Sequence, residues 1–203
     1  MKKGDKIVFL GDSITAGGGG PKGYVTLIQN RLKQRHSDWD LEIINAGISG
    51  NKVPDLQKRL DNDVLDRKPT LVVVYIGIND VWHSLDGKGT PKDLYEAGLE
   101  DIISRILHSG ARVMLCTPSV IGEKTDGTNP LDKLLDEYAG ISRRIAAFFN
   151  IPVCDLRKAF LDYLKVHNRK NENSGILTAD TCHLNGEGNA LVAQTMLSAA
   201  VKE

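Results

Sequence analysis

Ser13, Asp180 and His183 have the side-chain types that acyl-transfer chemistry requires together. A serine hydroxyl is a weak nucleophile unless a base removes its proton, and an imidazole base needs a carboxylate that fixes its tautomer and stabilises its cation. Asp180 precedes His183 by three residues, so one tight turn places the carboxylate beside Nδ1 and leaves Nε2 for Ser13. These residues are therefore candidates for a nucleophile, a base and an orienting acid.

Three short polar segments could supply the hydrogen-bond donors that such a reaction needs. They are GDS at residues 11–13, NAG at residues 45–47 and GIND at residues 77–80. A tetrahedral intermediate is stabilised by preorganised donors, each worth roughly 3 kcal/mol. We expect the oxyanion hole to consist of the backbone N–H groups of Ser13 and Gly47 and the side-chain amide of Asn79. We assign Asp12 and Asp80, which flank these donors, structural support and no direct role in catalysis.

The elements that must position these residues form an alternating β-α pattern. Longer amphipathic stretches separate short apolar runs at residues 6–10, 41–45, 71–76, 112–116 and 151–154, and a last helix is predicted from near Gly186 to the end of the chain. Strands that are apolar on both faces and joined by helices predict a parallel sheet covered on both sides. Because ligands bind at the carboxyl ends of such strands, the three polar segments should lie at one edge.

Length, charge and cysteine content limit the classes of protein that fit. The 203 residues suit one domain over residues 1–203. The charges of 26 basic and 26 acidic residues cancel, and a net charge of zero argues against nucleic acid or an anionic membrane as a partner. The three cysteines lie far apart, so we expect neither a disulfide framework nor a metal cluster. The N-terminal apolar run reads as a strand and not as a signal peptide, which favours a cytoplasmic protein. Export of a longer precursor stays open.

Taken together, these motifs resemble the GDSL, or SGNH, family of esterases and lipases. The four letters of the second name fall on Ser13, Gly47, Asn79 and His183 in chain order, and Ile14 stands where the first name has leucine. The resemblance implies a three-layer α/β/α sandwich with a five-stranded, parallel, flavodoxin-like sheet. It also implies hydrolysis of esters or thioesters through an acyl-enzyme, with no metal or organic cofactor.

Two readings outside this family remain. Glycines at residues 17–20 and Gly23 precede a helix, and a glycine-rich helix N-terminus can bind a phosphate or nucleotide, but neither GxxxxGK[ST] nor a complete dinucleotide fingerprint is present. A non-catalytic binding module of the same fold is the second alternative. The complete set of motifs argues against both, since a binding protein has no use for His183 aligned with Ser13.

The loops give the only indication of the substrate. We expect residues 83–91 and 122–130 to form the rim of the site, and both segments are polar and contain no apolar lid. They favour a short acyl group, such as acetyl, on an alcohol or sugar. A lysophospholipase or thioesterase of the same family is the alternative. The partner is then a small-molecule ester, without stable membrane association, and the oligomeric state stays open.

Overall fold

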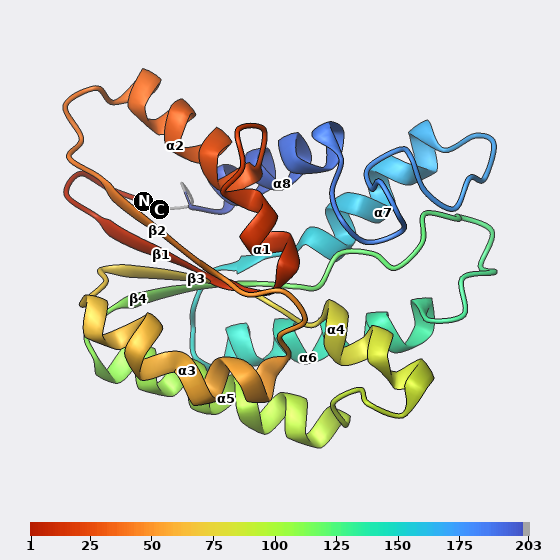
Figure 1. Ribbon diagram of the computed structural model, residues 1–203, viewed down its shortest axis with the longest axis horizontal. Coiled ribbons are helices and arrows are strands. Elements are labelled where there is room, and N and C mark those ends of the chain that lie inside the picture. The colour runs from red at the N-terminus through yellow and green to blue at the C-terminus, as the bar shows by residue number, and fades with distance from the viewer. Residues whose placement is uncertain (201–203) are drawn as a thin grey trace.

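A five-stranded parallel sheet forms the centre of the molecule in the computed structural model, which describes residues 1–200 (Figure 1). The strands are β1 (Lys6–Gly11), β2 (Glu42–Gly47), β3 (Leu71–Tyr75), β4 (Arg112–Cys116) and β5 (Val153–Cys154). Their order is β2-β1-β3-β4-β5 and every neighbouring pair is parallel. This is the flavodoxin-like order, so the predicted fold class is confirmed.

Helices cover both faces of the sheet and complete three layers (Figure 1). One face carries α1 (Ser13–Gly18), α2 (Tyr24–Arg35), α7 (Leu156–His167) and α8 (Gly186–Ala200), and the other carries α3 (Val53–Asp63), α4 (Ile78–Trp82), α5 (Lys92–His108) and α6 (Asp132–Phe148). Two 3₁₀ helices span Leu65–Arg67 and His83–Asp86. The predicted last helix begins at Gly186 as expected, and its continuation through residues 201–203 lies outside the described residues.

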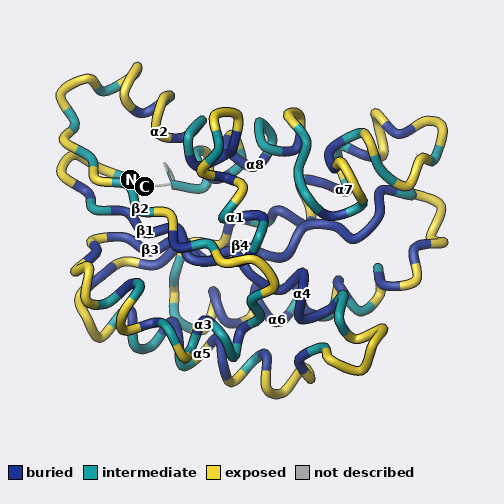
Figure 2. The backbone as a smooth tube through the Cα atoms, in the orientation of Figure 1, coloured by how far each residue is buried: buried dark blue, intermediate teal, exposed yellow. Residues whose placement is uncertain are grey.

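The central strands β1 and β3 are buried because their side chains are apolar on both faces. All five residues of β3 are buried, as are the residues of β1 that follow Lys6, and Figure 2 shows the central strands as the most deeply buried part of the chain. The edge strand β5 is shorter than the predicted run of residues 151–154. Pro152 has no N–H to donate to a ladder, so regular pairing begins only at Val153.

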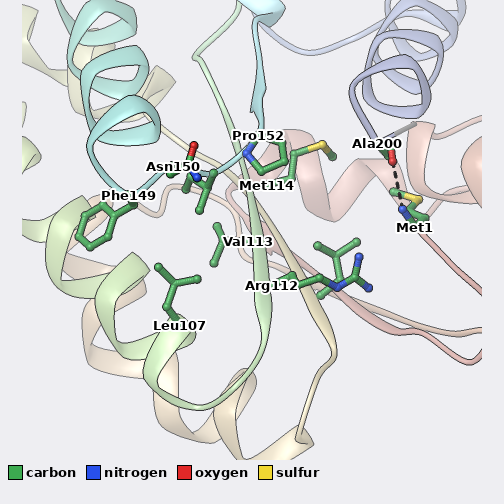
Figure 3. A pocket seen from close by; sticks show the side chains of 11 residues that line it. Met1, Leu107, Arg112, Val113, Met114, Phe149, Asn150, Pro152 and Ala200 are labelled. Atoms are coloured by element: carbon green, nitrogen blue, oxygen red, sulfur yellow. Dashed lines mark hydrogen bonds between the residues drawn. The ribbon is translucent and has the colours of Figure 1, made fainter. Parts of the chain in front are cut away.

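A cavity of about 300 Å³ lies at the amino ends of the strands (Figure 3). The three polar motifs follow the opposite, carboxyl ends. Leu71 and Arg112, the first residues of β3 and β4, line it, together with Leu107 and Phe149. Its walls are largely apolar, and the amino group of Met1 donates to the carbonyl oxygen of Ala200 at its rim. Because the candidate catalytic residues follow the carboxyl ends of the strands, this cavity is not their substrate site.

Within residues 1–200, no helix combines the length and the apolar character that crossing a membrane requires. The three cysteines, Cys116, Cys154 and Cys182, are buried free thiols.

Candidate active site

The sheet register brings the three polar motifs to one edge. Gly11, at the end of β1, pairs with Gly47 on one side and with Tyr75 on the other. Ser13 follows Gly11 by two residues, and Asn79 follows Tyr75 by four. The motifs therefore meet where the strand order reverses between β1 and β3, which is the place where open α/β sheets bind ligands.

The three residues predicted to do the chemistry lie within hydrogen-bonding distance of one another. Ser13 Oγ is 2.9 Å from His183 Nε2, although the two residues are 170 positions apart in the chain. His183 Nδ1 is 2.7 Å from Asp180 Oδ2. These distances suit transfer of the serine proton to the imidazole while the carboxylate fixes its orientation.

A tight turn presents the acid to the base, as the three-residue spacing predicts. Asp180 Oδ1 accepts the backbone N–H groups of Cys182 and His183, which leaves Oδ2 for the imidazole. Burial raises the pKa of Asp180, but its hydrogen bonds to the backbone and side chain of His183 outweigh that effect and the net pKa is lowered. The carboxyl group is therefore ionised at neutral pH, as an orienting partner for an imidazolium must be.

Ser13 opens α1 but does not cap it. Asp12 is the N-cap, and its Oδ1 accepts the N–H of Ile14 at 2.9 Å. The Ser13 N–H belongs to the first turn, where helical N–H groups have no acceptor within the helix. The side chain of Ser13 is thus free to contact His183, and its N–H is available to a ligand.

Asp12 and Asp80 are buried carboxyl groups that support these motifs. Burial, with a smaller contribution from the neighbouring charge of Asp80, raises the pKa of Asp12 to about 7. Burial also raises the pKa of Asp80 to about 6. Asp80 Oδ1 accepts the N–H of Val53, and its Oδ2 has no hydrogen-bond partner among residues 1–200. Both side chains bind nearby backbone, as expected for structural support.

The two remaining oxyanion candidates differ in how far they are already engaged. Asn79 is only 6% exposed, and its Nδ2 donates to the carbonyl oxygen of Asn51 at 3.0 Å. An amide has two N–H groups, so this bond leaves one for a substrate. The N–H of Gly47 donates to Asn45 Oδ1 at 2.9 Å. A donor role for Gly47 therefore requires Asn45 to share or release that N–H.

Two glycines at this edge cannot be replaced without displacing their neighbours. A Cβ on Gly47 would lie 2.1 Å from the backbone nitrogen of Ala16 in α1. Gly77, the N-cap of α4, has φ of 126°, and a Cβ there would lie 2.8 Å from the hydroxyl of Tyr95. Close contact between β2 and α1, and the sharp turn into α4, therefore both depend on glycine.

Sequence reasoning missed one buried residue that holds the loop before Asp180. Glu123 is fully buried, although its polar neighbourhood suggests an exposed loop. Its carboxylate accepts the N–H groups of Ile176, Leu177 and Thr178 and the hydroxyl of Thr178. No local signal identifies it, because its partners lie more than fifty positions away in the chain.

Asp180, Cys182 and His183 also form the cluster in residues 1–200 that most resembles a metal site, with ligand atoms within 4.8 Å of one another. Burial, however, raises the pKa of the Cys182 thiol to about 12, and a metal binds the thiolate. Asp180 and His183 already bind each other. The donor set therefore fits an acid–base pair better than a metal centre, and Cys182 packs as a small buried residue.

The surroundings of the site consist of glycine-rich and polar segments. A groove of about 460 Å³ between the loop after α1 and the start of α8 is lined by residues 20–23 and 184–186 together with Gly17 and Asn189, and none of the candidate catalytic residues lines it. Lys52 Nζ donates to the carbonyl oxygen of Lys88 and so ties the predicted rim loop of residues 83–91 to the start of α3. The N–H of Gly122, in the second rim loop, donates to Thr181 within the loop that carries the candidate base.

Known proteins resemble this chain in sequence and in structure. The sequence profile of the GDSL-like lipase/acylhydrolase family matches residues 9–191. An acetylxylan esterase of Geobacillus stearothermophilus is 34% identical over 179 residues, which cover 80% of each chain. The crystal structure of the acetyl xylan esterase AlAXEase is 43% identical, covers 97% of this chain and 100% of its own, and superposes with a TM-score of 0.93. An arylesterase of Vibrio mimicus is 31% identical over 113 residues, or 55% of this chain and 53% of its own.

Proposed function

This chain belongs to the GDSL-like lipase/acylhydrolase family, and we propose that it is a serine esterase that removes acetyl groups from sugars. The family and the named esterases among its relatives make it a carboxylic ester hydrolase. One observation carries the assignment of roles: Ser13 Oγ, His183 and Asp180 form a continuous hydrogen-bonded chain with contacts of 2.9 and 2.7 Å.

The reaction follows from that chain of contacts. Ser13 Oγ attacks the ester carbonyl carbon while His183 Nε2 takes its proton, and Asp180 stabilises the resulting imidazolium. The oxyanion binds to the Ser13 N–H, the free N–H of Asn79 and the Gly47 N–H that Asn45 gives up. His183 then protonates the leaving alcohol as the tetrahedral intermediate collapses to the acyl-enzyme. A water molecule attacks in the same way and releases the acid.

Two observations favour an acetyl ester of a sugar. Two similar proteins bear the name acetylxylan esterase, and one of them matches nearly the whole chain. Neither rim loop presents an apolar lid of the kind that would cover a long acyl chain.

The first experiment tests the nucleophile. The intact protein is treated with a fluorophosphonate, and the mass of the wild type is compared with that of Ser13→Ala. We expect one adduct on the wild type and none on the variant, because the reagent phosphonylates an activated serine. An adduct that persists in Ser13→Ala would remove Ser13 from this role. A folded wild type that never reacts would support a binding module instead.

The second experiment tests the substrate. Rates on nitrophenyl esters of two to twelve carbons are measured beside acetylated xylo-oligosaccharides and a lysophospholipid. We expect the highest kcat/KM on acetyl esters and release of acetate from the oligosaccharides. A maximum at ten or more carbons, or faster turnover of the lysophospholipid, would contradict the proposal and favour a lipase-like member of the family.

A further inference from the structure

The segment that joins β2 to α3 links all three polar motifs. At its start, the N–H of Ile48 donates to the carbonyl oxygen of Gly11, just before Asp12 and Ser13. At its end, the N–H of Val53 donates to Asp80 Oδ1. Between them, the carbonyl oxygen of Asn51 accepts the Asn79 amide. The shape of this short segment therefore determines how the candidate oxyanion donors face one another.

Arg59, on α3, binds this segment through side-chain hydrogen bonds. Its side chain is only 13% exposed, and its guanidinium makes three short contacts. Nη2 donates to the carbonyl oxygen of Gly11 at 2.8 Å, Nε donates to Asn51 Oδ1 at 2.7 Å, and Nη1 contacts Asp63 Oδ2 at 2.9 Å. A planar guanidinium with donors in fixed directions can tie two separate acceptors into one geometry, which a lysine cannot do.

Asn51 passes this constraint to Asn79. The Asn51 side chain accepts from Arg59 while its backbone carbonyl accepts one N–H of the Asn79 amide. Because the amide is planar, the bond to Asn51 also sets the direction of the second N–H. Without Arg59 the segment loses its contacts to Asn51 Oδ1 and to the carbonyl oxygen of Gly11, so the Asn51 backbone carbonyl can shift and turn that second N–H away from a developing oxyanion.

We infer that Arg59 is a positioning residue that orients the Asn79 amide through Asn51. This inference rests on the proposed function, since the orientation matters only if Asn79 stabilises an oxyanion. Arg59 itself touches neither the substrate nor Ser13 Oγ in this scheme. Its effect should therefore appear in kcat, with little change in KM, and should depend on the presence of Asn79.

A double-mutant cycle tests this dependence. kcat for nitrophenyl acetate is measured for the wild type, Arg59→Met, Asn79→Ala and the combined variant. We expect Arg59→Met to lower kcat about tenfold in the wild-type background and less than about threefold when Asn79 is already absent, because residues that act as one unit are not additive. A merely structural role would lower kcat by the same factor in both backgrounds.

A second arginine on the same side of the sheet provides a matched control. Arg105, on α5, pairs with Asp61 on α3 at 2.7 Å but contacts none of the three motifs. Arg105→Met should leave kcat within about twofold of the starting protein in both backgrounds. If Arg59→Met does not fold, as judged by circular dichroism and thermal melting, Arg59→Lys enters the same cycle, since it retains the charge and loses the fork.

The outcomes separate this inference from the function on which it rests. A wild type that does not hydrolyse nitrophenyl acetate would refute the proposed function. If the wild type is active, but Arg59→Met or Arg59→Lys lowers kcat by the same factor with and without Asn79, the role of Arg59 is overturned and the proposed function is not. A tenfold loss that disappears in the Asn79→Ala background would support it.

Discussion

Replacing Glu123 with glutamine should destabilise the protein more than most conservative changes do. Oε1 of Glu123 accepts three hydrogen bonds, from the N–H groups of Leu177 and Thr178 and from the Thr178 hydroxyl, and Oε2 accepts the N–H of Ile176. Glutamine keeps the first oxygen. Its amide nitrogen replaces the second and places a donor opposite the N–H of Ile176.

The magnitude follows from these four contacts. A buried N–H left without an acceptor costs about 1–3 kcal/mol, and hydrogen bonds to a charged acceptor are individually stronger than those to a neutral one. Relief from burying the charge offsets part of this loss. We therefore expect Glu123→Gln to lower the free energy of unfolding by about 2–4 kcal/mol.

Urea unfolding followed by tryptophan fluorescence measures this change, and esterase activity measures its effect on the site. Glu96→Gln is the matched control, because Glu96 is a surface residue that pairs with the exposed Arg144, and its urea midpoint should stay close to that of the wild type. We also expect a lower kcat for Glu123→Gln, since residues 176–178 lead directly into the loop of Asp180 and His183. A loss below about 0.5 kcal/mol for Glu123→Gln would refute the reasoning that this carboxylate holds the loop.

Two further predictions concern the carboxyl edge of the sheet. Gly47→Ala should lower the thermal midpoint by several degrees and kcat by at least tenfold, because the new Cβ would lie 2.1 Å from the backbone nitrogen of Ala16 and would clash with it. A variant with the wild-type thermal midpoint and the wild-type kcat would refute this clash. The raised pKa of Asp12, about 7, means that the folded state binds more protons than the unfolded state between about pH 4 and pH 7, so its contribution to stability falls as pH rises through that window. Asp12→Asn should remove this fall, which is on the order of 4 kcal/mol across the window. Urea titrations at pH 4 and pH 8 that show the same pH dependence in both proteins would contradict this prediction.

The motifs at the sheet edge were readable from the sequence because their partners follow a general rule. Apolar runs identify the strands, and parallel strands bring their carboxyl ends together, so the sequence alone predicts Ser13, Gly47 and Asn79 at one edge of the sheet. The turn between Asp180 and His183 was predictable from spacing alone. The prediction that Ser13 contacts His183 depended on the combination of motifs and on the family resemblance, because no local pattern shows that residues 170 positions apart meet.

The remaining features depend on side-chain conformation and tertiary contacts. The sequence shows Asn45 two residues before Gly47, but not that its side chain turns to accept the Gly47 N–H. Glu123 sits among polar residues, and only the packed structure reveals four donors converging on it. Arg59 has the helical spacing of an ordinary surface residue, so the sequence does not predict the hydrogen bonds from its guanidinium to Gly11 and Asn51.

The separation of the nucleophile and its base along the chain also bears on protein synthesis. Ser13 emerges from a ribosome early, whereas His183 follows 170 residues later. On the proposed roles, a nascent chain contains the nucleophile without its base until His183 has been made, and it cleaves no ester until the loop of His183 has docked against the end of β1. Turnover thus reports that both ends of the domain have been made and joined, which makes enzyme activity a sensitive measure of complete folding in a cell-free translation reaction.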